Sequence, residues 1–127
     1  MIFTELLAEV QKLERQEKRA HSDDYFEIVI VRDSLDPLHK ILTAYFGAPL
    51  KPEGDTPSGE ANRRAKAHGG IRKDQAMYFR QDGDLAECVL LWPWGSGSRI
   101  TVKIIRSRGT SDAPGFLSVL ANFFRRK

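Results

Sequence analysis

Residues 75–107, QAMYFRQDGDLAECVLLWPWGSGSRITVKIIRS, decide the predicted fold, because three strand-like runs follow one another there. The runs are rich in β-branched and aromatic side chains, and they cover residues 75–81, 85–92 and 99–107. Asp82-Gly83-Asp84 joins the first two runs, and residues 95–98 (GSGS) join the last two. Both connections have the composition of hairpin turns. The stretch therefore predicts a three-stranded antiparallel meander.

The chain before the meander predicts two helices and one more strand. Apolar residues at helical spacing predict a helix over residues 2–19, although its second half has no apolar stripe. Residues 25–32 (YFEIVIVR) are apolar in succession, which predicts a central strand covered on both faces. Asp36 as N-cap and Pro37 in the first turn predict the start of a second helix, which Gly47 ends.

Two further helices are predicted around the meander. A short basic helix precedes it, with Ala61, Ala65 and His68 on one face and Gly69 as its stop. Ser111 or Asp112 caps a last helix. The apolar face of that helix comprises Phe116, Leu117, Leu120, Phe123 and Phe124.

These elements predict one α+β domain over residues 1–127. Its antiparallel sheet has about four strands, one early strand plus the three-strand meander, with helices packed on it. The expected order is helix, strand, helix, short basic helix, three strands, helix.

Composition indicates a soluble globular protein with an uneven charge distribution. The net charge is +3 and the pI is about 9.2, but residues 1–57 carry a balance of −4 and residues 58–127 a balance of +7. No apolar run approaches the roughly 20 residues of a membrane span, and acids near the N-terminus argue against a signal peptide. With Cys88 as the single cysteine, no internal disulfide is expected. A cytoplasmic protein without membrane contact is the expectation.

The basic second half offers a candidate anion-binding or nucleic-acid-binding surface. The candidate residues are Arg63, Arg64, Lys66, Gly69, Gly70, Arg72, Lys73, Arg99, Lys103, Arg106 and Arg108. Successive glycines can present backbone N–H groups to an anion. However, Gly69 and Gly70 follow a predicted helix, whereas a phosphate loop precedes one. The alternative, which we favour for residues 58–75, is a solvated connection whose basic side chains are exposed and contribute little to folding.

Trp92-Pro93-Trp94 is a candidate aromatic platform, because tryptophans beside arginines can stack bases or another planar ligand. Trp92 continues the alternation of Cys88 and Leu90, which predicts that its ring packs in the core. Trp94 follows the proline and is the predicted exposed member of the pair.

Other residue types point to no recognised chemistry. The three histidines lie far apart, and no cysteine or histidine neighbours them at metal-ligand spacing, so no metal or cofactor is expected. Cys88 is interpreted as a small buried hydrophobe. We therefore predict no catalytic residues and do not expect an enzyme.

Three functions follow, in order of preference. The first is a non-catalytic binding or protein-interaction module, with Ile2, Phe3, Leu6 and Leu7 as a face for self-association. The second is a nucleic-acid-binding or phosphate-binding domain that uses the basic second half. The third is a small enzyme without a recognisable motif.

Overall fold

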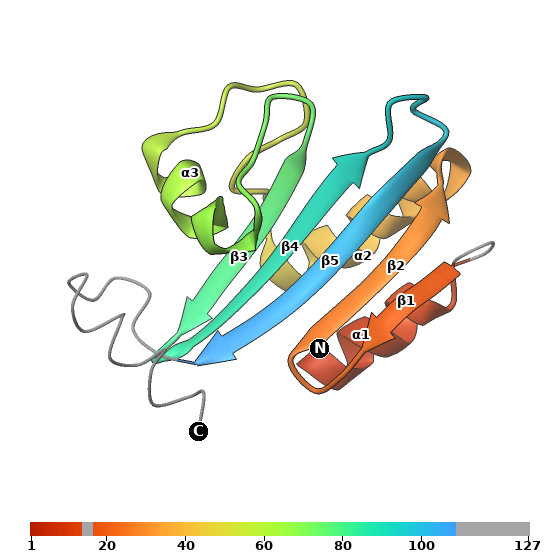
Figure 1. Ribbon diagram of the computed structural model, residues 1–127. Helices are drawn as coiled ribbons and strands as arrows, with labels where there is room; N and C mark the ends of the chain where they lie inside the picture. Colours follow the sequence, from red (N-terminus) through yellow and green to blue (C-terminus); the bar gives the residue numbers. More distant parts are fainter. Residues whose placement is uncertain (14–16, 109–127) are drawn as a thin grey trace.

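The computed structural model describes residues 1–13 and 17–108, and within them the chain forms an α+β fold (Figure 1). In chain order the elements are α1 (Phe3–Gln11), β1 (Glu17–His21), β2 (Tyr25–Val31), the 3₁₀ turn η1 (Arg32–Ser34), α2 (Leu35–Phe46), α3 (Gly59–Ala65), the 3₁₀ turn η2 (Lys66–His68), β3 (Ala76–Asp82), β4 (Leu85–Pro93) and β5 (Arg99–Arg108). The predicted fold class is confirmed. The predicted C-terminal helix falls outside the described residues.

The five strands lie in the order β1-β2-β5-β4-β3, and each neighbouring pair is antiparallel. Strands β3, β4 and β5 form the predicted meander. Asp82 pairs with Leu85 across a two-residue turn, in which Gly83 has a positive φ of 61°. Strand β2 is central, as predicted, because it lies between β1 and β5.

Strand β1 is a correction to the prediction of a helix over residues 2–19 and to the prediction of about four strands. Helix α1 ends at Gln11, and the polar run Glu17–His21 is a five-residue strand at the sheet edge. Its register shifts between Lys18 and Ala20, which leaves a bulge. Exposed charges and a bulge are common protections of an edge strand against pairing with another chain.

Helices α1 and α2 cover one face of the sheet, behind the strands in Figure 1. Alternate residues of the strands meet the apolar faces of these helices in the larger core. From the strands it includes Phe26, Ile28, Ile30, Tyr78, Val89, Leu91, Ile100, Val102 and Ile104, and from the helices Phe3, Leu6, Leu7, Val10, Leu38 and Leu42. Since Phe3, Leu6 and Leu7 are buried here, the predicted self-association face of α1 retains only Ile2 as an exposed residue.

The start of α2 differs from the prediction. The helix begins at Leu35, with Ser34 as N-cap and no side-chain capping bond, so Asp36 lies inside the first turn. Leu35 is buried in the core, and the turn η1 leads directly into the helix. At the other end Gly47 ends the helix as predicted, with a φ of 83° and its N–H donating to the Thr43 carbonyl at 2.9 Å.

A buried carboxylate ties β3, β4 and β5 to α2. Glu87 is 4% exposed, and its register partners on the two neighbouring strands are Arg80 and Arg106. The Arg80 Nε lies 3.6 Å from one carboxylate oxygen, and the Arg106 Nε lies 3.5 Å from the other. Tyr45 donates its hydroxyl to Glu87 at 2.7 Å, and burial, reinforced by this hydrogen bond, raises the pKa of Tyr45 to about 12.

The second face of the sheet is covered over β3 and the adjoining part of β4 by α3 and η2 (Figure 1). Ala61 and Ala65 pack there against residues of the strands. The strand residues in this smaller core are Met77, Cys88, Leu90 and Ile105. Within the described part of the chain, no helix covers β1, β2 and β5 on this face.

Candidate binding surface

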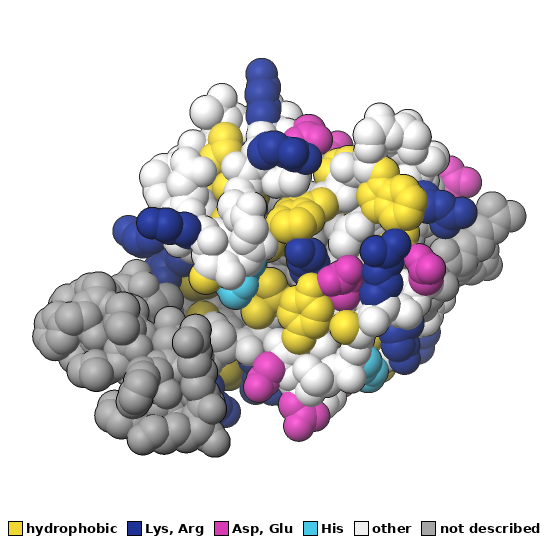
Figure 2. Space-filling model, in the orientation of Figure 1, with side chains coloured by type: hydrophobic (Ala, Val, Ile, Leu, Met, Phe, Trp, Pro, Cys, Tyr) yellow, Lys and Arg dark blue, Asp and Glu magenta, His cyan; other side chains and the backbone are white. Residues whose placement is uncertain are grey.

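The uncovered part of this face carries aromatic and basic side chains close together. We call it the open half of the sheet, and we define it by Arg19, Trp92, Trp94 and Arg99, with Tyr25 of β2 and Lys103 of β5. In Figure 2, hydrophobic side chains gather over the middle of this face, with basic and acidic ones between them. The surface draws residues from four strands, so only the folded sheet assembles it.

Trp94 is the exposed ring of this surface, with 39% of its area accessible. It follows the last residue of β4, and its backbone N–H donates to the Arg99 carbonyl at 2.9 Å. Its indole Nε1 donates to the hydroxyl of Thr101 at 2.9 Å. The prediction that Trp94 is exposed is confirmed, and the hydrogen bond fixes the orientation of the ring above β5.

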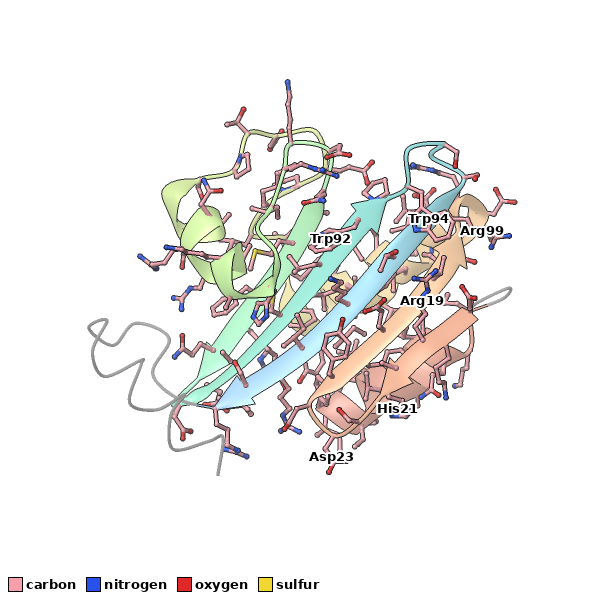
Figure 3. All side chains as sticks on the ribbon, viewed as in Figure 1. Arg19, His21, Asp23, Trp92, Trp94 and Arg99 are labelled. Atoms are coloured by element: carbon pink, nitrogen blue, oxygen red, sulfur yellow. The ribbon has the colours of Figure 1, made fainter. Side chains whose placement is uncertain are left out.

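Two arginines flank Trp94 (Figure 3). The guanidinium of Arg19 lies 5.7 Å from the centroid of the Trp94 ring, close to the outer limit of about 6 Å for a cation–π contact. Arg99 is exposed, and none of the ion pairs among the described residues involves it. Arg99 is among the candidates that the sequence predicts, whereas Arg19 is not, because the predicted helix over residues 2–19 includes it.

Trp92 and Lys103 form the side of the surface next to η2. Lys103 Nζ lies 3.6 Å from the centroid of the Trp92 ring. Trp92 is half-buried and packs on the smaller core, so its predicted place beside Cys88 and Leu90 is confirmed. Its indole Nε1 is buried, and the described residues offer it no hydrogen-bond acceptor.

Two acidic residues near these cations, Glu17 and Glu27, have partners. Glu17 lies 3.5 Å from the guanidinium of Arg19. Glu27 accepts the hydroxyl hydrogen of Tyr25 and is the register partner of Lys103. Burial, with the Glu27 contact, raises the pKa of Tyr25, so this hydroxyl stays a donor at neutral pH. The surface is thus mixed in charge, with cations in excess.

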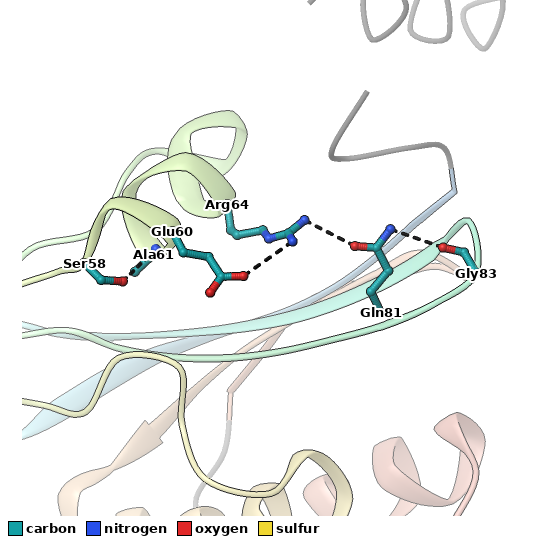
Figure 4. A network of polar contacts seen from close by, with 6 residues as sticks. All are labelled: Ser58, Glu60, Ala61, Arg64, Gln81 and Gly83. Atoms are coloured by element: carbon teal, nitrogen blue, oxygen red, sulfur yellow. Dashed lines mark hydrogen bonds and ion pairs between the residues drawn. The ribbon is translucent and has the colours of Figure 1, made fainter. Parts of the chain in front are cut away.

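The basic segment 58–75 is held to the sheet by specific contacts (Figure 4). Ser58, a cap that sequence analysis did not identify, accepts a hydrogen bond from the Ala61 N–H at 3.1 Å. The guanidinium of Arg64 donates to Gln81 at 3.2 Å, pairs with Glu60 at 3.5 Å and lies over a β3 ring. Only 8% of the Arg64 side chain is exposed, so it is not the exposed cation that the sequence indicates.

The Gly69-Gly70 pair ends this helical segment, as predicted. Gly69 has a φ of 104°, and the Gly70 N–H donates to the Ala65 carbonyl at 2.9 Å, which is the long bond of a Schellman cap. Gly69 also lies against Trp92, since a Cβ on this glycine would be 2.7 Å from the Cη2 atom of the ring. The two glycines therefore have a structural role, and their candidate role in anion binding remains a prediction.

The remaining candidate cations do not lie on one surface. Side chains alternate along β5, so Arg106 lies over the Phe3 ring on the α1 face, opposite to Lys103. Arg108, on the same side of the strand as Arg106, lies 3.8 Å from Asp84. Arg72 pairs with Asp74 at 3.6 Å in the connection before β3. The other three candidate cations lie on other elements, with Arg63 in α3, Lys66 in η2 and Lys73 beside Arg72.

Burial changes the pKa values of one histidine and of the cysteine. Among residues 1–13 and 17–108, no group of three His, Cys, Asp or Glu residues could hold a metal ion. Burial, with Lys103 nearby, lowers the pKa of His68. Cys88 is 4% exposed, and burial raises the pKa of its thiol to about 12.

Cys88 should therefore react slowly with a thiol reagent. Because burial raises the pKa of the native thiol, very little of it is ionised at pH 8, whereas an unfolded cysteine with a pKa near 8.5 is substantially ionised. We expect Ellman's reagent to label the native protein at least about 100-fold more slowly than the protein in urea. Equal rates in the two states would show that Cys88 is accessible and would make it a candidate nucleophile.

Comparisons with protein-family models, curated proteins and solved structures found no match for this chain. Among the described residues, no helix is both long enough and apolar enough to cross a membrane.

Proposed function

We propose that this protein is a non-catalytic binding module whose partner docks on the open half of the sheet. The observation that carries the proposal is Trp94, an exposed ring held in place by Thr101 and flanked by two arginines. Tryptophan, tyrosine and arginine supply much of the binding energy at protein surfaces that recognise a partner. A ring whose orientation is already fixed loses little conformational entropy when the partner arrives.

Both edges of the sheet are protected against pairing with a partner strand, which supports docking on the face of the sheet. Strand β1 presents charged side chains and a bulge at one edge. At the other edge, Lys51 pairs with Met77 of β3 through two backbone hydrogen bonds of 3.1 and 2.9 Å. A partner strand would have to displace these contacts before it could extend the sheet.

Site-specific photo-crosslinking tests the proposed surface. In one variant, benzoylphenylalanine replaces Glu17 on the open half of the sheet. In the control variant, it replaces Lys40, an exposed residue of helix α2, and this helix packs on the opposite face of the sheet. In cell extract, we expect the variant with the crosslinker at position 17 to form adducts, and we expect these adducts to disappear when Trp94→Ala is introduced as well. Any adducts from position 40 should not change with Trp94→Ala. Sensitivity of the adducts to nuclease identifies a nucleic-acid partner, and nuclease-resistant adducts identify a protein partner.

Two results would contradict the proposal. One is an equal yield of adducts from both positions, and the other is a yield from position 17 that does not change with Trp94→Ala.

A further inference from the structure

The open half of the sheet carries exposed cations beside a fixed aromatic ring, which is the combination that recognises unpaired bases and their phosphates. Trp94 supplies the ring, and its indole N–H is already satisfied by Thr101. A base can therefore stack on the ring without breaking a hydrogen bond of the protein. Because every base has a π-face, such stacking tolerates many sequences.

The cations are placed on two sides of the ring. Arg99 lies beside Trp94 at the end of the β4–β5 hairpin, and Arg19 reaches the ring from β1. The two strands that carry these arginines are separated only by β2, so they are about 10 Å apart. Lys103, four residues along β5 from Arg99, lies roughly 13 Å further along the face. Phosphates on either side of a stacked base would meet these side chains.

We propose that the partner of the open half of the sheet is single-stranded nucleic acid, with a base stacked on Trp94 and phosphates bound by Arg19, Arg99 and Lys103. This inference rests on the proposed function. Charge complementarity favours an anion, because the surface carries three cations, Arg19, Arg99 and Lys103, against the two carboxylates of Glu17 and Glu27. A single strand fits better than a duplex, whose bases stack on each other and leave no free face for the ring.

Arg19 accommodates this arrangement because its contact with Trp94 is loose. At 5.7 Å from the ring centroid the guanidinium is not in close stacking contact. A base that enters above the ring displaces the guanidinium toward the adjacent phosphate, where a charge-assisted hydrogen bond replaces the cation–π contact.

Fluorescence anisotropy with a labelled mixed-sequence 15-mer RNA tests the inference on the full chain, with duplex RNA as the comparison probe. We expect Trp94→Ala to weaken binding of the single strand roughly 5- to 150-fold. Trp94→Phe should restore most of the affinity, because phenylalanine still stacks, but it should reduce the quenching of tryptophan fluorescence that we expect for the wild type, since only Trp92 then remains.

A charge-matched pair of double variants locates the phosphate contacts. Arg19→Ala/Arg99→Ala and Arg63→Ala/Lys73→Ala remove the same net charge, the first from the open half of the sheet and the second from segment 58–75. For the first we expect weaker binding and a slope of log affinity against log salt that is flatter by about 1.4, or roughly 0.7 for each lost contact. For the second we expect the wild-type slope.

Three results would overturn the inference. They are wild-type affinity in Trp94→Ala, equal binding of duplex and single strand, and a larger loss in Arg63→Ala/Lys73→Ala, which would place the anion site in segment 58–75. If no RNA binds while position 17 still gives Trp94-dependent adducts with protein, the inference fails and the proposed function stands. If neither RNA binding nor such adducts occur, both fail.

Discussion

Replacement of Glu87 by alanine should lower the free energy of unfolding by about 3 kcal/mol, because it leaves two arginines and a tyrosine hydroxyl without their shared partner. The Glu87 side chain is 5% exposed, and it accepts from Tyr45 while lying 3.5–3.6 Å from the Nε atoms of Arg80 and Arg106. The side chains of Arg80 and Arg106 are 40% and 31% exposed, so their charges would be only partly solvated without the carboxylate. Urea denaturation followed by circular dichroism measures the loss.

Glu60 is the matched control for this prediction. It also lies 3.5 Å from an arginine, Arg64, but its side chain is 48% exposed. We expect Glu60→Ala to cost less than about 1 kcal/mol, because water screens the exposed carboxylate and Arg64 keeps its hydrogen bond to Gln81. Tyr45→Phe, which removes only one hydrogen bond from Glu87, should cost about 1 kcal/mol. Similar losses in Glu87→Ala and Glu60→Ala would show that the buried cluster contributes no more than a surface pair.

The parts of the fold that could be predicted are those in which local pattern and tertiary environment agree. The meander of β3, β4 and β5 has alternating or continuous apolar residues, and its turns contain glycine, so each strand is identifiable from its own residues. Strand β1 could not be found in this way. Glu17–His21 contains no large aliphatic residue, and its conformation depends on pairing with β2, which local propensity does not report.

The candidate surface was predictable only in part, for a related reason. Trp94 and Arg99 lie next to a recognisable hairpin, so their exposure follows from the local sequence. Arg19 joins them from a strand 75 residues earlier than Trp94, and nothing near Arg19 in the sequence indicates that contact. For Arg64 the prediction of exposure is wrong. Its charge predicts an exposed side chain, but Gln81 and a ring of β3 bury it.

Lys51 is a second charged residue whose burial the sequence does not indicate. It is 1% exposed, and its ammonium group donates to the backbone carbonyls of Lys73 and Gln75 at 2.5 Å each. Burial lowers the pKa of Lys51. Its location in a loop rich in Pro, Gly and Asp predicts solvent exposure, so only the tertiary structure reveals that it holds the connection before β3.

Replacement of Gly69 by alanine should destabilise the protein by about 2–3 kcal/mol, from backbone strain and a steric overlap together. Gly69 has a φ of 104°, a conformation that residues with a Cβ rarely adopt. The new Cβ would also lie 2.7 Å from Cη2 and 3.2 Å from Cζ2 of Trp92, so the ring or the η2 turn must move. The movement would also disturb Lys103, which lies over the same ring.

Gly70 separates the two contributions, because it has a positive φ of 83° and no atom within 4 Å of where its Cβ would be. Gly70→Ala should therefore show the backbone strain alone, about 1 kcal/mol. In a Trp92→Leu background, Gly69→Ala should lower the free energy of unfolding by less than it does in the wild type. The smaller leucine side chain leaves room for the new Cβ. Thermal and urea unfolding of Gly69→Ala, Gly70→Ala, Trp92→Leu, Gly69→Ala/Trp92→Leu and the wild type measure these differences. Equal losses in Gly69→Ala and Gly70→Ala would mean that the contact with Trp92 imposes no constraint, and that the glycine pair serves the helix end only.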